Sequence, residues 1–142
     1  APTTENVTGY WSGKPYSFKI DNLVDTLKGK WGTSEYDLRK YRLANQIEGV
    51  MDGHLFSLRG LPLVGRIEGT LPCGQIDLSY SEISASVTGT LCSVPYNFTR
   101  DLGETDIIVN VVRNIVESAI ADSFPLPDAR RLAFVILRGF EF

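Results

Sequence analysis

The stretch DIIVNVVRNIVESAIADSF, residues 106–124, carries the strongest structural pattern of this chain. Apolar residues recur along it every three or four positions for about five turns, which predicts an amphipathic helix. Many of these residues are β-branched, so intrinsic helix propensity is modest and the helix needs an apolar surface to pack on. The apolar positions are Ile107, Ile108, Val111, Val112, Ile115, Val116, Ala119, Ile120 and Phe124.

The residues before this helix supply such a surface as alternating strands. Residues 47–58 read IEGVMDGHLFSL, and Asp52-Gly53 is a strong signal for a two-residue type I′ turn. Folding about this turn pairs Met51 with His54 and separates an apolar face from a polar one. The apolar face of this hairpin is formed by Ile47, Met51, Phe56 and Leu58.

A second hairpin is predicted over residues 73–92, CGQIDLSYSEISASVTGTLC, with its turn centred on residues 82–83. This register places Leu78 opposite Val87 and brings the larger apolar side chains of both strands to one face. Residues 66–71 alternate in the same way between the two hairpins. The result is about four antiparallel strands with one apolar side, a pattern typical of a sheet covered on a single face.

The same register places Cys73 directly opposite Cys92, at a separation that a disulfide can bridge. Closing this loop would stabilise the fold by about 3 kcal/mol. We therefore predict a Cys73–Cys92 disulfide, and the alternative is two free thiols. A metal site is not expected, because the chain has one histidine and no CxxC pair.

Two further helices are predicted. Residues 17–31 carry apolar side chains at helical spacing after Ser17, a good N-cap. A capping box at residues 101–104 precedes the long helix. The tail from Asp128 to Phe142 fits either a buried strand or a short helix, and we favour a helix capped by Asp128 and ended by Gly139.

These elements predict an α+β fold, in which a curved antiparallel β-meander of about four strands packs on a long C-terminal helix, with an N-terminal helix. Residues 1–142 are expected to form a single domain without internal repeats, and residues 1–13 a flexible arm.

The composition limits the classes of function. The chain is 43% hydrophobic and carries a net charge of −3, which argues against a nucleic-acid-binding protein. No apolar run approaches the roughly 18 to 20 residues of a transmembrane helix, so no transmembrane segment is expected. His54 is the only histidine and sits beside a turn, and no hydrolase or phosphate-binding motif occurs. We therefore expect no catalytic residues, no cofactor and no metal.

Several features favour a secreted protein. Asn6-Val7-Thr8 and Asn97-Phe98-Thr99 fit the N-glycosylation pattern, so Asn6 and Asn97 are predicted acceptors. The start Ala1-Pro2-Thr3 resembles a chain left after removal of a signal peptide. The predicted disulfide points to the same oxidising compartment.

Two stretches resemble the arthropod group-seven mite allergen family of the tubular lipid-binding superfamily. They are residues 20–43, IDNLVDTLKGKWGTSEYDLRKYRL, and residues 54–91, especially LRGL at 58–61 followed by Arg66. The long apolar helix is also similar. The resemblance implies a curved sheet that wraps a long helix around an apolar groove for a lipid, without catalysis. The groove positions that it implies are Leu23, Leu27, Phe56, Leu58, Ile76, Leu78, Tyr80, Val87, Val111, Val112 and Ile115.

The chain departs from that family in length, because residues 93–104 are too few for the family's additional strands. A shortened sheet would leave the groove open and expose an apolar edge, which favours a homodimer. The alternative to a ligand groove, which does not depend on the resemblance, is that the apolar side chains simply fill the interior.

The leading hypothesis is a secreted, non-enzymatic carrier of a hydrophobic small molecule, such as a lipid, sterol, terpenoid or pigment, held between sheet and helix, with Tyr80 as a polar handle. The alternative is an extracellular interaction or assembly protein that self-associates without a ligand pocket. An extracellular enzyme ranks third.

Overall fold

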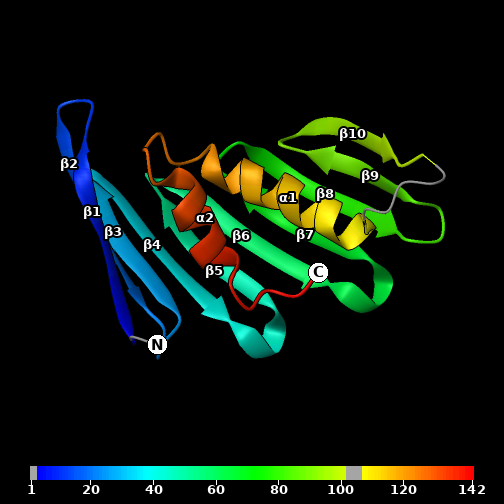
Figure 1. The fold of residues 1–142 in the computed structure, drawn as a ribbon, viewed down its shortest axis with the longest axis horizontal. Helices are drawn as coiled ribbons and strands as arrows, with labels where there is room; N and C mark the ends of the chain where they lie inside the picture. The colour runs from blue at the N-terminus through cyan, green and yellow to red at the C-terminus, as the bar shows by residue number, and fades with distance from the viewer. Residues whose placement is uncertain (1–2, 102–106) are drawn as a thin grey trace.

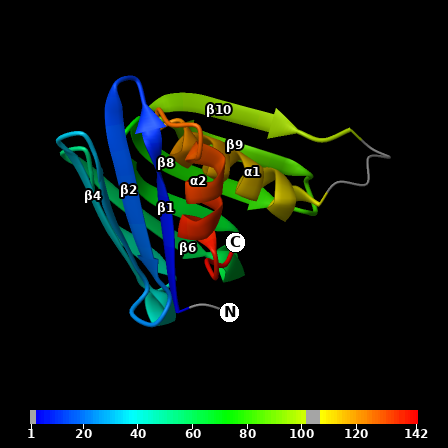
Figure 2. The same cartoon turned by 60° about the vertical axis from the view of Figure 1, so that its left-hand side comes forward.

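The computed structural model describes residues 3–101 and 107–142. Within these residues a single antiparallel sheet of ten strands runs in sequence order, and two helices pack against its concave face (Figure 1). Figure 2 shows the sheet curving around both helices. The elements are β1 (Thr4–Trp11), β2 (Lys14–Asp21), β3 (Thr26–Trp31), β4 (Ser34–Tyr41), η1 (Arg42–Ala44), β5 (Gln46–Met51), β6 (His54–Leu61), η2 (Pro62–Val64), β7 (Arg66–Leu71), β8 (Gly74–Ser81), β9 (Ser86–Leu91), β10 (Val94–Thr99), α1 (Ile108–Ala121) and α2 (Ala129–Leu137).

The sheet is built from a repeat of two strands and twenty residues, contrary to the expectation of a chain without repeats. Each repeat has a glycine near the end of its odd-numbered strand, and a two-residue turn follows that strand. A longer turn of four residues then connects to the next repeat. The glycines that mark the period are Gly9, Gly29, Gly49, Gly69 and Gly89.

The repeated glycines sit where two strands approach too closely for any side chain. Gly49 has φ 156°, and a Cβ added to it would lie 1.9 Å from the carbonyl oxygen of Asp37. Gly69 repeats this arrangement against Ser57, with φ 154° and the same 1.9 Å. Glycines of this kind are a recognised device for bending a sheet. The period therefore gives the sheet its curvature at regular intervals.

The core lies between the concave face and the helices. Every strand from β1 to β9 contributes at least one buried side chain, with burial alternating along β2, β4, β6 and β8, and α1 contributes Ile108, Val112, Val116 and Ile120, all fully buried. Leu132 and Ile136 of α2 are buried in the same cluster. The inward-facing side chains of the strands and the buried faces of the two helices therefore pack together in one interior.

The predicted four-stranded meander with an N-terminal helix is wrong. Residues 17–31, predicted as a helix, form the end of β2, a four-residue turn and β3. Ile20 pairs with Leu27 across that turn, so two residues seven apart meet as they would on a helix face. Residues 4–11 of the expected flexible arm form the edge strand β1, which pairs with β2.

The long C-terminal helix is shorter than predicted. The helix α1 begins at Ile108 and ends at Ala121, with Ile107 at its N-cap position. Residues 102–104 of the expected capping box lie outside the described residues. The predicted tail helix is confirmed as α2, with Asp128 at its N-cap position and Gly139 at φ 80° shortly after its end.

The first predicted hairpin is confirmed pair by pair, including Met51 with His54. The second is displaced by two residues, because Leu78 faces Gly89 rather than Val87. Its turn spans four residues, and a shift of two keeps every side chain on the predicted face. The Cys73–Cys92 disulfide is present, with the Cα atoms 4.9 Å apart, but it joins two neighbouring turns rather than an opposed pair of strand residues.

Candidate functional site

The eleven predicted groove positions fall into three groups. Leu23 lies on an exposed turn, and Tyr80 is partly buried at the end of β8. Val111 and Ile115 are partly buried on α1 and line an open surface groove. The remaining seven are buried side chains of the core, namely Leu27, Phe56, Leu58, Ile76, Leu78, Val87 and Val112.

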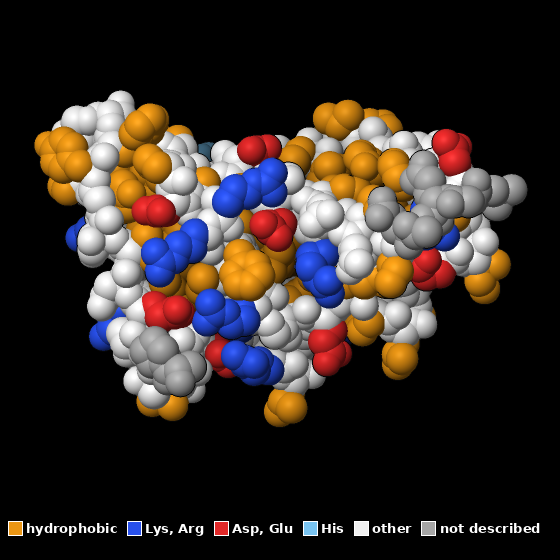
Figure 3. All heavy atoms as spheres, in the orientation of Figure 1, with side chains coloured by type: hydrophobic (Ala, Val, Ile, Leu, Met, Phe, Trp, Pro, Cys, Tyr) orange, Lys and Arg blue, Asp and Glu red, His pale blue; other side chains and the backbone are white. Residues whose placement is uncertain are grey.

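The groove lies between α1 and the last hairpin of the sheet, and its volume is about 510 Å³. Its apolar surface comes from both elements, and Figure 3 shows hydrophobic side chains gathered over this part of the molecule. The lining residues are Leu91, Cys92, Tyr96, Phe98, Val111, Asn114, Ile115, Ser118, Ala119 and Asp122.

The groove follows from how α1 sits on the sheet. The helix buries Val112 and Val116 against the core, so Val111 and Ile115, one position earlier in each turn, face sideways. In β10, Tyr96 and Phe98 point to the same side because they are two residues apart. Two apolar walls therefore meet without a further element of the described chain between them.

One rim of the groove is polar. Asn114, Ser118 and Asp122 are spaced four residues apart on α1, so they lie in a row along the helix. The arrangement offers an apolar floor with hydrogen-bonding groups along one side. Pockets for small molecules commonly combine these two features.

Tyr80 is separate from the groove. Its hydroxyl is buried and has no hydrogen-bond partner among the described residues, and burial raises the pKa of this phenol. An unpaired buried hydroxyl destabilises a fold, so the Tyr80 hydroxyl lowers the stability of the protein locally. The structure does not place it against the lining of the groove.

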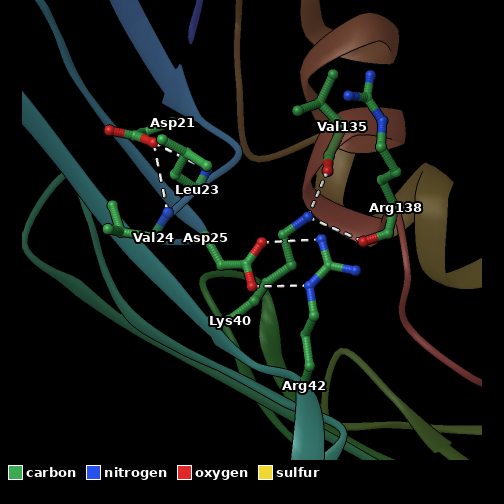
Figure 4. Close-up of polar contacts among 8 residues, drawn as sticks. All are labelled: Asp21, Leu23, Val24, Asp25, Lys40, Arg42, Val135 and Arg138. Atoms are coloured by element: carbon green, nitrogen blue, oxygen red, sulfur yellow. Dashed lines mark hydrogen bonds and ion pairs between the residues drawn. The ribbon is translucent and has the colours of Figure 1, made fainter. Parts of the chain in front are cut away.

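The sheet and α2 are joined by a partly buried lysine, Lys40 (Figure 4). Lys40 Nζ donates hydrogen bonds to the carbonyl oxygens of Val135 and Arg138, at 3.1 and 2.9 Å. Beside it, Arg42 donates two hydrogen bonds to the Asp25 carboxylate, at 2.7 and 2.8 Å. A cation at the end of a helix is favourable because the last carbonyl groups there lack intrahelical partners.

Burial lowers the pKa of Lys40 to about 8, and Arg42 and Arg138 act in the same direction while Asp25 opposes them. The space beside the lysine is about 10 Å³, close to the volume that one water molecule needs. Such a space is too small for an organic substrate. The geometry therefore assigns Lys40 to fastening α2 onto β4.

The tail is attached at further points. Asn45 and Glu141 exchange two hydrogen bonds of 2.8 Å, and the Tyr16 hydroxyl donates to the Asp128 carboxylate at 2.7 Å. Hydrogen bonding to Asp128 raises the pKa of Tyr16. These contacts hold the start of α2 and the C-terminal tail on the sheet.

Both predicted glycosylation acceptors lie on the edges of the sheet. Asn6 belongs to β1 and Asn97 to β10, and both side chains are exposed on the face away from the helices. His54, also exposed, stands at the start of β6 opposite Met51.

Comparisons with protein-family models, curated proteins and solved structures found no match for this chain. Among the described residues, no helix is long and apolar enough to cross a membrane.

The sequence analysis missed the sheet side of the groove. Leu91, Tyr96 and Phe98 were not among the predicted positions, although residues 94–98 alternate apolar and polar in the manner of a strand. Pro95 weakens that pattern, since proline is found in sheets mainly on edge strands, and β10 is an edge strand.

Proposed function

We propose that this protein is a secreted, non-enzymatic carrier of a hydrophobic small molecule, such as a lipid, sterol, terpenoid or pigment. The observation that carries the proposal is the open apolar groove between α1 and the β9–β10 hairpin. The binding site is thus still between sheet and helix, but on the surface beside α1 rather than in the interior beneath it.

The dimensions of the groove support this proposal. Its volume of about 510 Å³ is large enough for a small molecule, and its mainly apolar lining distinguishes it from the polar hollow over β5–β9, of about 420 Å³. An apolar ligand would bind chiefly through removal of apolar surface from water, at about 25 cal/mol per Å². The polar rim on α1 favours an amphiphile whose polar group lies beside Ser118 and Asp122.

Secretion is supported by the disulfide and by the positions of the two sequons. The Cys73–Cys92 bond requires an oxidising environment, and both acceptor asparagines are accessible at the surface. N-glycosylation would take place in the same pathway.

Ligand binding is tested by titration with a fluorescent fatty acid and by native mass spectrometry of the purified protein. Organic extraction then releases any small molecule that co-purifies. Ile115→Glu places a charge in the apolar floor and should weaken binding at least tenfold. Asn110→Glu is the matched control, because it adds the same charge on an exposed position of the same helix. Equal binding by Ile115→Glu and the wild type, or no binding by the wild type, would contradict the proposal.

The second candidate function is self-association into an assembly. It is favoured by the open sheet, whose edge strands β1 and β10 each have one side without a neighbouring strand. Sedimentation velocity over a range of concentrations separates the candidates. A concentration-dependent dimer that binds no fluorescent lipid would favour assembly, and a monomer that binds the lipid would favour carriage.

A further inference from the structure

One end of the sheet carries a row of exposed aliphatic side chains. The turns that join β2 to β3, β4 to β5, β6 to β7 and β8 to β9 all lie at this end, which runs along the lower edge and round to the right-hand side in Figure 1. The second residue of each of these four-residue turns is exposed, at 76%, 107%, 102% and 101% of the maximum. We name these four residues the tip row: Leu23, Leu43, Leu63 and Ile83.

The tip row has a regular geometry. Its members are twenty residues apart in sequence and two strands apart in the sheet. Since neighbouring strands are about 4.8 Å apart, successive tips are separated by about 10 Å and the whole row spans about 30 Å. Figure 3, in the same orientation as Figure 1, shows separate hydrophobic projections along that edge.

Comparison of the four turns with one another shows that the aliphatic residue is not a by-product of the repeat. The positions around it have diverged: the preceding residue is Asn22, Arg42, Pro62 or Glu82 in the four turns. The second position is leucine in three turns and isoleucine in the fourth. A single exposed leucine is ordinary, but here an exposed aliphatic side chain recurs at the same position of all four turns.

The turns hold the tips in fixed positions. Asp21 accepts hydrogen bonds from the backbone N–H groups of Leu23 and Val24, at 3.0 and 3.4 Å (Figure 4). Ser81 does the same for Ile83 at 3.2 Å. The other two turns are single 3₁₀ turns that end at a residue with positive φ. Each aliphatic side chain is therefore presented outward on an ordered loop.

The small number of tip residues and the wide spacing between them argue against a protein partner. A stable protein interface uses roughly 20–30 residues a side in one packed patch, whereas the row consists of four tips about 10 Å apart, two of them extended by the exposed neighbours Val24 and Val64. A second copy of the chain would leave gaps between the tips. A fluid acyl layer closes around each inserted side chain separately, so the occupant that fits is a lipid surface.

The charged residues near the tip row indicate which kind of lipid surface would fit it. Around the row, Arg42 is paired with Asp25 at 2.7 Å, and Arg100 lies 3.8 Å from Glu82. Arg66 is paired with Asp77 at 2.9 Å. Because these cations are already matched by carboxylates, they form no basic patch for anionic headgroups. The expected surface is therefore zwitterionic.

We propose that the tip row is a membrane-docking edge, which inserts its four aliphatic side chains into the interfacial region of a phosphatidylcholine-type bilayer. The site is distinct from the groove on α1 and does not depend on the carrier function. Docking would be peripheral and reversible.

The test is flotation of the purified protein with phosphatidylcholine vesicles on a density gradient. The wild type should float, and raising the salt from 0.1 to 0.5 M should not release it. Each single substitution, such as Leu43→Ser, should weaken partitioning about tenfold, because one aliphatic side chain no longer leaves water. Replacing all four tips with serine should abolish flotation.

A triple variant is the matched control. Val50→Ser, Leu55→Ser and Val94→Ser remove exposed aliphatic side chains that are not in the tip row, and this variant should float like the wild type. Ile115→Glu should also float, so failure of the groove and failure of the tip row are distinguishable. Thermal unfolding should be unchanged in the serine variants of the tips, since those side chains are exposed.

Three results would overturn the proposal. The wild type could remain in solution with phosphatidylcholine vesicles, or the fourfold tip variant could float equally well. Alternatively, the wild type could be a dimer that the fourfold tip variant converts to a monomer, which would assign the row to a second copy.

Leu43→Trp gives an independent readout through tryptophan fluorescence. A blue shift of the emission with vesicles supports insertion, and an unchanged emission spectrum contradicts it.

Discussion

The partly buried Lys40 makes the stability of this protein depend on pH. The pKa of Lys40 is lowered from 10.5 to about 8, chiefly by burial. Between these two pH values the unfolded chain binds more protons at this residue than the folded one. The Lys40 contribution to the free energy of unfolding therefore rises with pH through this window.

Comparison of the wild type with Lys40→Met isolates this contribution. Between pH 7.5 and 9.5 the wild type should gain about 1–2 kcal/mol in unfolding free energy over the variant, after allowance for solvent screening. A neutral amine keeps two N–H groups, so both hydrogen bonds to α2 can persist. Urea unfolding at the two pH values measures the difference. A gap that stays constant with pH would contradict the assigned pKa.

The glycines of the repeat provide a second test at the level of residues. Gly49→Ala meets both an unfavourable φ and a carbonyl oxygen 1.9 Å from the new Cβ, so we expect a loss of about 2–4 kcal/mol in unfolding free energy. Gly53→Ala has φ 77° but nothing within 4 Å of its Cβ, and should cost only about 1 kcal/mol. Equal losses in chemical denaturation would show that close approach at Gly49 is unimportant.

At the scale of elements, local turn chemistry was predictable and strand number was not. Asp52-Gly53 admits essentially one kind of hairpin, and the observed pairing follows it. In residues 17–31 the apolar side chains of two strands and a turn fall at intervals that also suit a helix, so periodicity alone could not decide between them. The twenty-residue spacing of Gly29, Gly49 and Gly69 would have decided it.

The residues of the groove also divide into those that the sequence could indicate and those that it could not. Val111 and Ile115, groove positions implied by the resemblance, lie on a side of α1 whose apolar spacing can be read from one segment. Tyr96 and Phe98 were missed because their role depends on where β10 lies relative to α1, which is a tertiary arrangement. Leu23 was predicted to line an interior groove, but the turn that contains it places the side chain in solvent.

The edge strands lead to a prediction about glycosylation. Expression in a eukaryotic secretory host should add a glycan at both Asn6 and Asn97, each exposed on an edge strand. A glycan there would hinder a second sheet from pairing with the free edge. Asn6→Gln with Asn97→Gln should therefore associate more strongly at high concentration, as measured by light scattering. Absence of glycans by mass spectrometry, or equal association, would contradict this.

For the whole molecule, the repeat explains why the two helices are needed. Ten strands bent to one side form a concave apolar face that the sheet cannot cover by itself. The helices α1 and α2 fill it, and Lys40 and Asn45 fasten the second helix and the tail to the sheet. The groove and the tip row then arise at two places that the helices leave open.

This dependence predicts the outcome of truncation. A chain ending at Thr99 lacks both helices and exposes inward-facing residues such as Phe56 and Leu78, which are fully buried in the intact protein. We expect it to aggregate and to lose cooperative unfolding, because one face of the sheet would be unpaired apolar surface. A chain beginning at Lys14 loses only the edge strand β1 and keeps the helices, so it should unfold cooperatively at a lower denaturant concentration. Circular dichroism through a urea titration compares the two. Cooperative unfolding of the helix-free chain would mean that the ten strands are stable without their cover.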